Sequence, residues 1–306
     1  MDITVILDYL IRGLSLGSVY AIIALGYTMV YGIAKMLNFA HGDVIMVGGY
    51  ICFFSMSGLS SHFEEGSVAA AVVPAVAGTL AAMVVCTVLG VTIERLAYKP
   101  LRQASSLAVL ITAIGVSYFL QNAALLLWSA NPKVFTPVVG RGSLQVGPLS
   151  ISYVTLLTIA VCVVIMIALT TFTSRGKMGK AMWAVSEDKG AAQLMGINVN
   201  ATISLTFAIG SALAGIAGVL FMSAYPTLTP TTGSMPGIKA FTAAVFGGIG
   251  SIPGALLGGL LLGIIEIFAG AYISTQLQNA IVFAVLIVVL VVRPAGLLGK
   301  TIREKV

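Results

Sequence analysis

The most constraining feature of this sequence is a series of apolar runs, each close to twenty residues long and without a charged residue. About twenty helical residues, rising about 1.5 Å each, cross the roughly 30 Å of bilayer hydrocarbon. A transmembrane β-barrel would show short alternating segments instead. The sequence therefore predicts an all-α polytopic membrane protein. The expected spans lie near residues 13–33, 44–59, 68–93, 107–128, 149–173, 201–224, 254–273 and 279–292.

The composition supports a permanent membrane location. Hydrophobic residues make up 58% of the chain and charged residues 8%, and the mean hydropathy is +1.06. Soluble domains carry far more charge. The chain opens Met-Asp without a basic segment or a cleavage site, so we expect the first run to remain as a span. Cys52, Cys86 and Cys162 lie in apolar runs without metal-ligand spacing, which predicts small buried residues and no metal or cofactor.

The distribution of basic residues predicts the orientation. Four segments are expected on the cytoplasmic side, namely 34–43, 94–106, 174–200 and the tail from Arg293. They hold most of the 16 Lys and Arg residues, and the ones left outside are Arg12, Lys133, Arg141 and Lys239. This arrangement needs the short piece 240–251 to reach the cytoplasmic side and turn at "SIPG". We therefore expect about nine crossings (eight to ten), an outer N-terminus and a cytoplasmic C-terminus. A re-entrant loop in place of the short crossing stays open.

We attribute the net charge of +6 to the basic residues that set this orientation, and we do not expect nucleic-acid binding. Small residues one turn apart predict close helix–helix contacts in lipid. The pairs are Gly13 with Gly17, Gly254 with Gly258, Gly259 with Gly263, and Ala214 with Gly218.

Two Gly/Pro-broken polar stretches interrupt the apolar pattern. "AKMLNFAHGD" (34–43) and "GGIGSIPG" (247–254) lie on the same predicted side of the membrane. The first could simply be a capped turn, with Asp43 as the N-cap of the next span. Paired breaks in the two halves of a transporter also indicate its pathway. Under that hypothesis the inner end of the path or its gate contains Asn38, His41, Asp43, Gly248 and Ser251.

Glu266 is the only acidic residue well inside a predicted span. Such a group is a candidate for a transport role, although a structural hydrogen bond or snorkelling to the surface also remains open. The scarcity of ionisable groups within the spans counts against an ion-coupled secondary transporter. Catalytic patterns such as HExxH are absent from the sequence, and "GLLGKT" (296–301) lacks a complete phosphate-loop pattern, so neither an enzyme nor an ATP site is expected.

The segment 174–200, "SRGKMGKAMWAVSEDKGAAQLMGINVN", is the longest polar stretch. From Gly179 to Met195 it shows helical spacing, and Gly196 is typical of the residue after a helix end. An amphipathic helix here could rest on the membrane or insert into a groove of a partner protein.

The motifs "MLNFAHGD", "AVFGGIGSIPGALLGG" and "VSEDKGAAQLMGIN" resemble those of permeases of bacterial ABC importers for branched-chain amino acids, essentially from end to end of the chain. ABC importers carry Glu-Ala-Ala, three residues and then Gly in the helix that docks on the ATPase. Ala191, Ala192 and Gly196 match this pattern. Gly190 stands in place of the glutamate, with Glu187 and Asp188 just before it.

The resemblance implies a single permease domain over residues 1–306 in the bacterial inner membrane, with an ATPase-coupling helix in 174–200. It implies a heterodimer with a second, similar permease, two cytoplasmic ATPase subunits, and a periplasmic binding protein that delivers leucine, isoleucine or valine. Membrane lipid would surround the spans, and nucleic acid would play no part. Related permeases that carry other amino acids, urea or short amides remain alternatives.

Overall fold

The computed structural model describes residues 3–63, 67–140 and 142–299. Its long helices are α1 (Ile3–Ala34), α2 (His41–Ser60), α3 (Val68–Ile93), α4 (Ser106–Trp128), α5 (Tyr153–Arg175), α8 (Val199–Ala224) and α10 (Ile252–Tyr272). The shorter helices are α6 (Lys177–Glu187), α7 (Lys189–Leu194), α9 (Ser234–Gly247) and α11 (Gln278–Val292). A π-helical turn, η1 (Glu94–Tyr98), and a 3-10 turn, η2 (Lys99–Leu101), extend α3. The strands are β1 (Lys133–Val134), β2 (Ser143–Val146), β3 (Leu149–Ser152) and β4 (Thr227–Leu228).

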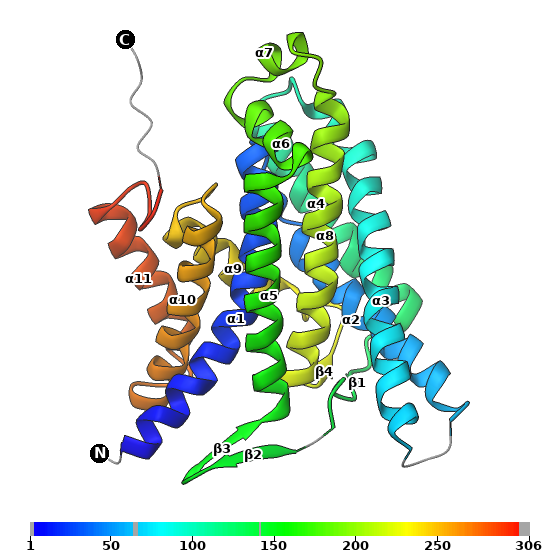
Figure 1. Cartoon of the computed structure of the whole chain (residues 1–306), viewed down its shortest axis with the longest axis vertical. Helices are drawn as coiled ribbons and strands as arrows, with labels where there is room; N and C mark the ends of the chain where they lie inside the picture. Colours follow the sequence, from blue (N-terminus) through cyan, green and yellow to red (C-terminus); the bar gives the residue numbers. More distant parts are fainter. Residues whose placement is uncertain (1–2, 64–66, 141, 300–306) are drawn as a thin grey trace.

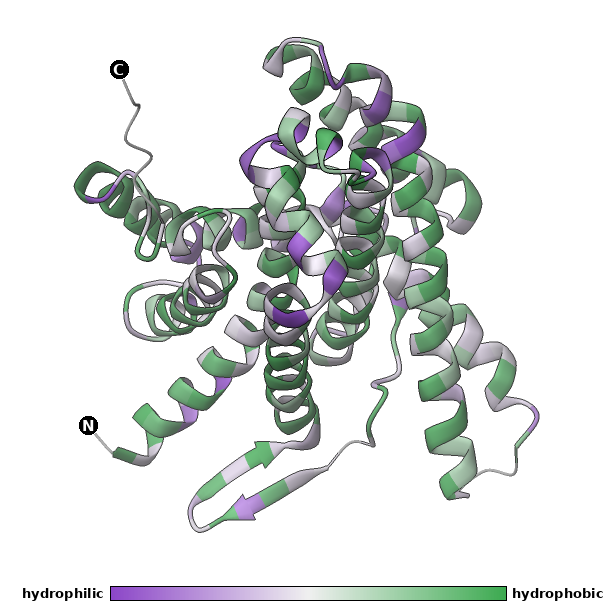
Figure 2. Ribbon diagram, turned by 45° about the horizontal axis from the view of Figure 1, so that its top comes forward, coloured by the Kyte–Doolittle hydropathy of each residue, from purple (hydrophilic) through white to green (hydrophobic). Residues whose placement is uncertain are grey.

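The long helices form one bundle along the long axis of the molecule (Figure 1). The start of α1 and the β2–β3 hairpin lie at one end, here called the hairpin end, while α6 and α7 lie at the other, here called the α7 end. Hydrophobic residues cover the long helices, and hydrophilic residues gather towards the α7 end (Figure 2). The all-α membrane fold predicted from the sequence is confirmed.

Within the described residues, seven helices are long and apolar enough to cross a membrane. They are α1, α2, α3 with its extension, α4, α5, α8 and α10. The expected number was about nine, and the difference lies in α9 and α11, which are only 14 and 15 residues long. The predicted span ends agree with the helix ends within a few residues in most cases. One difference is residues 149–152, which form β3 rather than helix because Leu149 and Ile151 alternate with serines and pair with β2.

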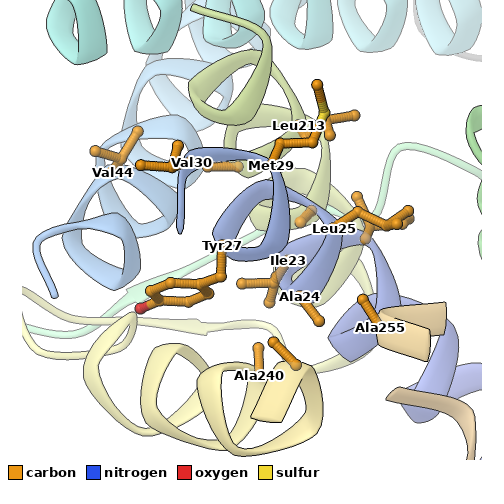
Figure 3. Packing of buried hydrophobic residues seen from close by; sticks show 14 of the residues in the cluster. Ile23, Ala24, Leu25, Tyr27, Met29, Val30, Val44, Leu213, Ala240 and Ala255 are labelled. Atoms are coloured by element: carbon orange, nitrogen blue, oxygen red, sulfur yellow. The ribbon is translucent and has the colours of Figure 1, made fainter. Parts of the chain in front are cut away.

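Helix α1 forms the centre of the bundle. Its side chains pack between α2, α8, α9 and α10, as Figure 3 shows with Val44, Leu213, Ala240 and Ala255 around the labelled residues of α1. By contrast, α4 and α5 bury only a few residues each, and their exposed side chains are mostly large and apolar. The outer helices therefore offer an apolar surface of the kind that lipid covers.

Glycine allows α1 and α10 to pack with their backbones in contact. A Cβ atom on Gly17 would lie 2.7 Å from the Cα of Leu260, and one on Gly263 would overlap the backbone of Gly17. The close contact predicted from the glycine spacing is therefore present. The three cysteines are buried and unpaired, as the sequence predicts.

Candidate functional site

The chain between α1 and α2 turns back into the bundle instead of forming a cap at the end of α1. Lys35, directly after α1, has a φ of 58°, which is rare for a residue with a side chain and reverses the chain direction. The His41 ring, at the start of α2, lies 4.7 Å from the Tyr27 ring and packs on Gly26 of α1. Helix α2 therefore begins well inside the bundle.

The three polar residues of this segment are all buried, with 3%, 1% and 1% of Asn38, His41 and Asp43 exposed. The side-chain oxygen Oδ1 of Asn38 accepts a hydrogen bond from the Tyr98 hydroxyl of η1 at 2.9 Å. His41 Nε2 has no hydrogen-bond partner among the described residues. These side chains are therefore part of the packed interior.

Asp43 does not cap α2, contrary to the prediction. The N-cap residue is Ala40, which makes no side-chain cap bond, and Asp43 is the third residue of the helix. Its Oδ1 accepts a hydrogen bond from Gln121 Nε2 of α4 at 2.9 Å. The same nitrogen lies 3.2 Å from Ser117 Oγ and 3.2 Å from Ser234 Oγ. We call Asp43, Ser117, Gln121 and Ser234 the Asp43 cluster, and it joins α2, α4 and α9.

A second segment enters the bundle from the hairpin end, and sequence reasoning missed it. This segment, residues 225–233, follows α8 and contains strand β4, which pairs with β1. Its Leu228 is buried against Gly49 of α2. A Cβ atom on Gly42 would lie 2.7 Å from the Gly233 carbonyl oxygen, so the first turns of α2 and α9 touch through their backbones. The Pro- and Gly-rich stretch "PTLTPTTGSMPG" was the available signal.

Gly248 and Ser251 lie in the turn between α9 and α10, away from the Asp43 cluster. Ser251 caps α10 by accepting a hydrogen bond from the Gly254 N–H at 3.2 Å, and Gly248 has a φ of 107°, which favours glycine. The turn passes Gly32, near the α7 end of α1. Residues 297 and 298 donate backbone hydrogen bonds at 2.9 Å to the last carbonyls of α9, so this part of "GLLGKT" closes a helix end, while its residues 300 and 301 lie outside the described residues.

Glu266 is part of a buried ion pair. Its Oε1 lies 2.6 Å from Lys239 Nζ of α9 and accepts a hydrogen bond from Gln278 Nε2 of α11 at 3.0 Å. The prediction that Lys239 lies outside the membrane is therefore wrong, because the side chain is buried between helices. Glu266 is also not the only buried acidic residue, since Glu94 is fully buried against Arg102 and Ser204.

The segment 174–200 forms two helices rather than one. Asp188 adopts an extended conformation after α6 and accepts hydrogen bonds from the Gly190 and Ala191 N–H groups, which starts α7. Gly196 follows with a φ of 81°. The break arises because the Asp188 side chain competes for the N–H groups that a continuous helix would use.

Most of α7 projects from the molecule (Figure 1). Glu187, Asp188 and Ala191 are exposed, whereas Ala192 is buried. Beyond them, Leu194 and Met195 are 89% and 82% exposed and form an apolar tip.

Lys189 connects α7 to the bundle through a 3.4 Å hydrogen bond to the Ala34 carbonyl. Partial burial, and then the positive charges of Arg102 and Lys35, lower the pKa of Lys189.

A cavity of about 510 Å³ lies at the hairpin end between α1, α5 and the end of α8. Its polar lining includes Arg12, Ser15, Thr155 and Tyr225. Arg12 pairs with Asp8 at 2.9 Å across one turn of α1. None of the residues predicted for the path or for ATPase coupling lines this cavity.

Comparison with known proteins gives a match along nearly the whole chain. The family model described as "Branched-chain amino acid transport system / permease component" matches residues 9–290. The chain is 46% identical over 305 residues to the high-affinity branched-chain amino acid transport system permease protein BraD of Pseudomonas aeruginosa, covering 98% of each chain. It is 45% identical over 306 residues to the permease protein LivH of the corresponding Escherichia coli system, covering 98% of this chain and 97% of LivH. A probable LivH of Methanocaldococcus jannaschii is 27% identical, covering 91% of this chain and 88% of that protein.

Proposed function

The chain belongs to the family of branched-chain amino acid transport permeases, and from this premise we propose that it forms half of the translocation path for leucine, isoleucine and valine in a bacterial ABC importer. The family predicted from the motifs is confirmed, and with it a multi-pass membrane transport subunit. The observation that carries the proposal is identity of about 45% over nearly the full length of the chain and of permeases named for this transport.

The proposed assembly contains a second, similar permease, two cytoplasmic ATPase subunits and a periplasmic binding protein. The α7 end faces the cytoplasm in this arrangement. The basic residues support this orientation, since those of η1, η2, α5 and α6 and of the loops beside them gather at the α7 end, while Lys239 is buried in an ion pair. Arg12 and Lys133 would then face the periplasm.

Segment 174–200 is proposed as the contact with the ATPase. The supporting geometry is a projecting helix with an apolar tip, Leu194 and Met195, beside the exposed Glu187, Asp188 and Ala191. A small exposed apolar surface rimmed by polar groups is typical of a protein–protein contact. Ala192 is buried beneath this surface and Gly196 ends α7, so these two residues would shape the contact rather than make it.

Energy would reach the membrane helices mechanically. Closure of the ATPase pair would move α6 and α7, which connect α5 to α8 and pack on α1 through the buried Met182 and Val185. Tilting of these helices would open the path to one side of the membrane at a time. The permease would form and break no covalent bond.

For the gate we propose the two broken segments, of which the first turns back into the bundle and the second lies near the α7 end of α1. Asn38, His41 and Asp43 start the first, and Gly248 and Ser251 form the turn that passes the last part of α1. Glu266 was a further candidate for the path. Its contacts with Lys239 and Gln278 support a structural role, in which it holds α9, α10 and α11 together.

The test is uptake of labelled leucine by cells that carry the complete transport system, with and without this gene. We expect uptake to require the gene and to be competed by valine but not by urea. Uptake that survives deletion of the gene, or competition by urea alone, would contradict the proposed substrate.

A second experiment tests the ATPase contact with the variant Leu194→Asp. Two exposed positions elsewhere serve as controls: Ile287→Asp on the membrane-facing side of α11, and Ser60→Asp at the end of α2 that lies at the hairpin end. Only Leu194→Asp should lose ATPase binding while the permease still reaches the membrane.

A further inference from the structure

The Asp43 cluster lies near half the depth of the bundle. Ser117 is the middle residue of α4, and Gln121 lies about one turn further along the same helix. Asp43 and Ser234 belong to the first turns of α2 and α9, which meet at Gly42 and Gly233. Hydroxyl, amide and carboxyl groups therefore gather where a bilayer is most apolar.

The backbone beside this cluster is irregular and partly exposed. Residues 229–233 lead into α9 through turns rather than helix, with backbone hydrogen bonds of 3.1 Å from the Thr232 N–H to the Thr229 carbonyl and from the Ser234 N–H to the Thr231 carbonyl. Thr231 within this stretch is exposed. Non-helical backbone at membrane depth is tolerated where it is buried in protein or lines a water-filled space, because lipid satisfies no backbone N–H or carbonyl group. Thr231 is exposed in this chain, so by this rule its expected neighbour is water or another protein rather than lipid.

The surface around the cluster mixes polar and apolar groups. Ser117, Gln121 and Ser234 are partly exposed, and Met235 on the next position of α9 is 42% exposed. Helix α4 contributes no large buried face that would close over them, since its buried residues are Val109, Ala113, Leu120 and Ala124. A few polar groups among apolar ones are typical of a site that small solutes contact.

The charge of Asp43 also favours a water-filled space beside this cluster. The ion pairs among the described residues do not include Asp43, whose carboxyl group accepts a hydrogen bond from the neutral Gln121 amide. The first turns of two helices, α2 and α9, supply partial positive charge beside it. A carboxyl group without a cation at this depth is compatible with nearby water and unfavourable next to lipid.

We propose that the face formed by the middle of α4 and the start of α9 lines the aqueous translocation path at half depth. Ser117, Gln121, Thr231 and Ser234 contact the water and the solute that pass through it. The inference rests on the proposed function, because it assigns one side of the proposed permease to the path. It places α4 beside that path, whereas the sequence alone does not distinguish α4 from a lipid-facing span.

The experiment uses single cysteines in the complete transporter, in a parent whose three native cysteines are replaced by alanine and which reaches the membrane in the same amount as the unmodified permease. Ser117→Cys and Thr231→Cys are the test variants. Val164→Cys is the matched control, because Val164 is the middle residue of α5, is 65% exposed and lies among apolar residues. Each is treated with a charged, membrane-impermeant methanethiosulfonate reagent and, separately, with a lipid-soluble maleimide.

We expect the charged reagent to label both test variants about tenfold faster or more than the control, since charged groups are excluded from lipid. Labelling should also block leucine uptake in the test variants alone. Labelling of Ser117→Cys and Thr231→Cys by the lipid-soluble reagent only would place this face in lipid and overturn the inference. Labelling by neither reagent would place it in a dry protein contact and overturn it as well. If labelling occurs as expected but the solute is not leucine, the proposed substrate fails while the inference stands.

Discussion

Removing one partner of the buried Lys239–Glu266 pair should strongly destabilise the protein. Glu266→Gln keeps the size of the side chain but leaves the Lys239 ammonium without its counter-charge in the interior. Breaking a buried ion pair in this way costs about 3–5 kcal/mol. For a chain of this size the midpoint of thermal unfolding should fall by on the order of 10 °C.

The double variant Lys239→Met with Glu266→Met separates the charge effect from the packing effect. It removes both charges and keeps a similar side-chain volume, so we expect most of the lost stability to return. The three native cysteines are buried, so a thiol-reactive fluorescent dye can report unfolding of the purified permease in detergent. Asp8→Asn serves as the control, because the Asp8–Arg12 pair is exposed and should contribute no more than about 0.5 kcal/mol.

Two results would refute this reasoning. One is an unfolding midpoint for Glu266→Gln no lower than that of Asp8→Asn, and the other is a double variant as unstable as the single one. Leucine uptake by the double variant then tests the role of Glu266. If the pair is structural, uptake should recover together with stability. A double variant that folds but does not take up leucine would instead support a transport role for Glu266.

Three further substitutions have defined expectations. Gly263→Val should destabilise the α1–α10 contact by about 1–3 kcal/mol in thermal unfolding, whereas Gly115→Val, at a site with open space around it, should cost less than about 1 kcal/mol. Asp188→Ala should remove the cap of α7 at a cost of about 1 kcal/mol, seen as faster proteolysis of segment 174–200 without loss of membrane insertion; unchanged cleavage would contradict the capping role. Tyr98→Phe should leave Asn38 Oδ1 unpaired and cost about 1–3 kcal/mol, and an unfolding midpoint equal to that of the parent would argue against this bond.

Local signals in the sequence were enough to predict most of the helices. Apolar runs bounded by polar residues gave ends for α3, α4 and α8 that agree with the structure within about two residues. The spacing of Gly13, Gly17, Gly259 and Gly263 predicted the backbone contact between α1 and α10 without identifying the two helices as partners. These features depend on residues close together in the chain, which is why they can be predicted.

The features missed by sequence reasoning depend on contacts between distant segments. Lys239 was counted as an outer loop residue because its partner, Glu266, comes 27 positions later and nothing local connects the two. Asp43 was expected to cap its own helix, yet its carboxyl group is bound by Gln121, 78 positions away. A polar residue inside an apolar chain shows that a partner is needed, but only the fold identifies that partner.

The polar segments that lead into α2 and α9 follow from one physical requirement. A helix that begins inside a membrane leaves its first N–H groups without partners, so its N-terminus needs polar groups at that depth. Helices α2 and α9 both begin there, and glycines 42, 233 and 237 let their first turns touch. Because α9 is antiparallel to α10, with Gly247 against Gly254 and Ala243 against Gly258, a tilt of that hairpin would move the α9 N-terminus against α2. The Asp43 cluster joins both helices to α4, so such a tilt would either break these hydrogen bonds or carry α4 along with it. The alternation of the path between the two sides of the membrane would then depend on the few hydrogen bonds of this cluster.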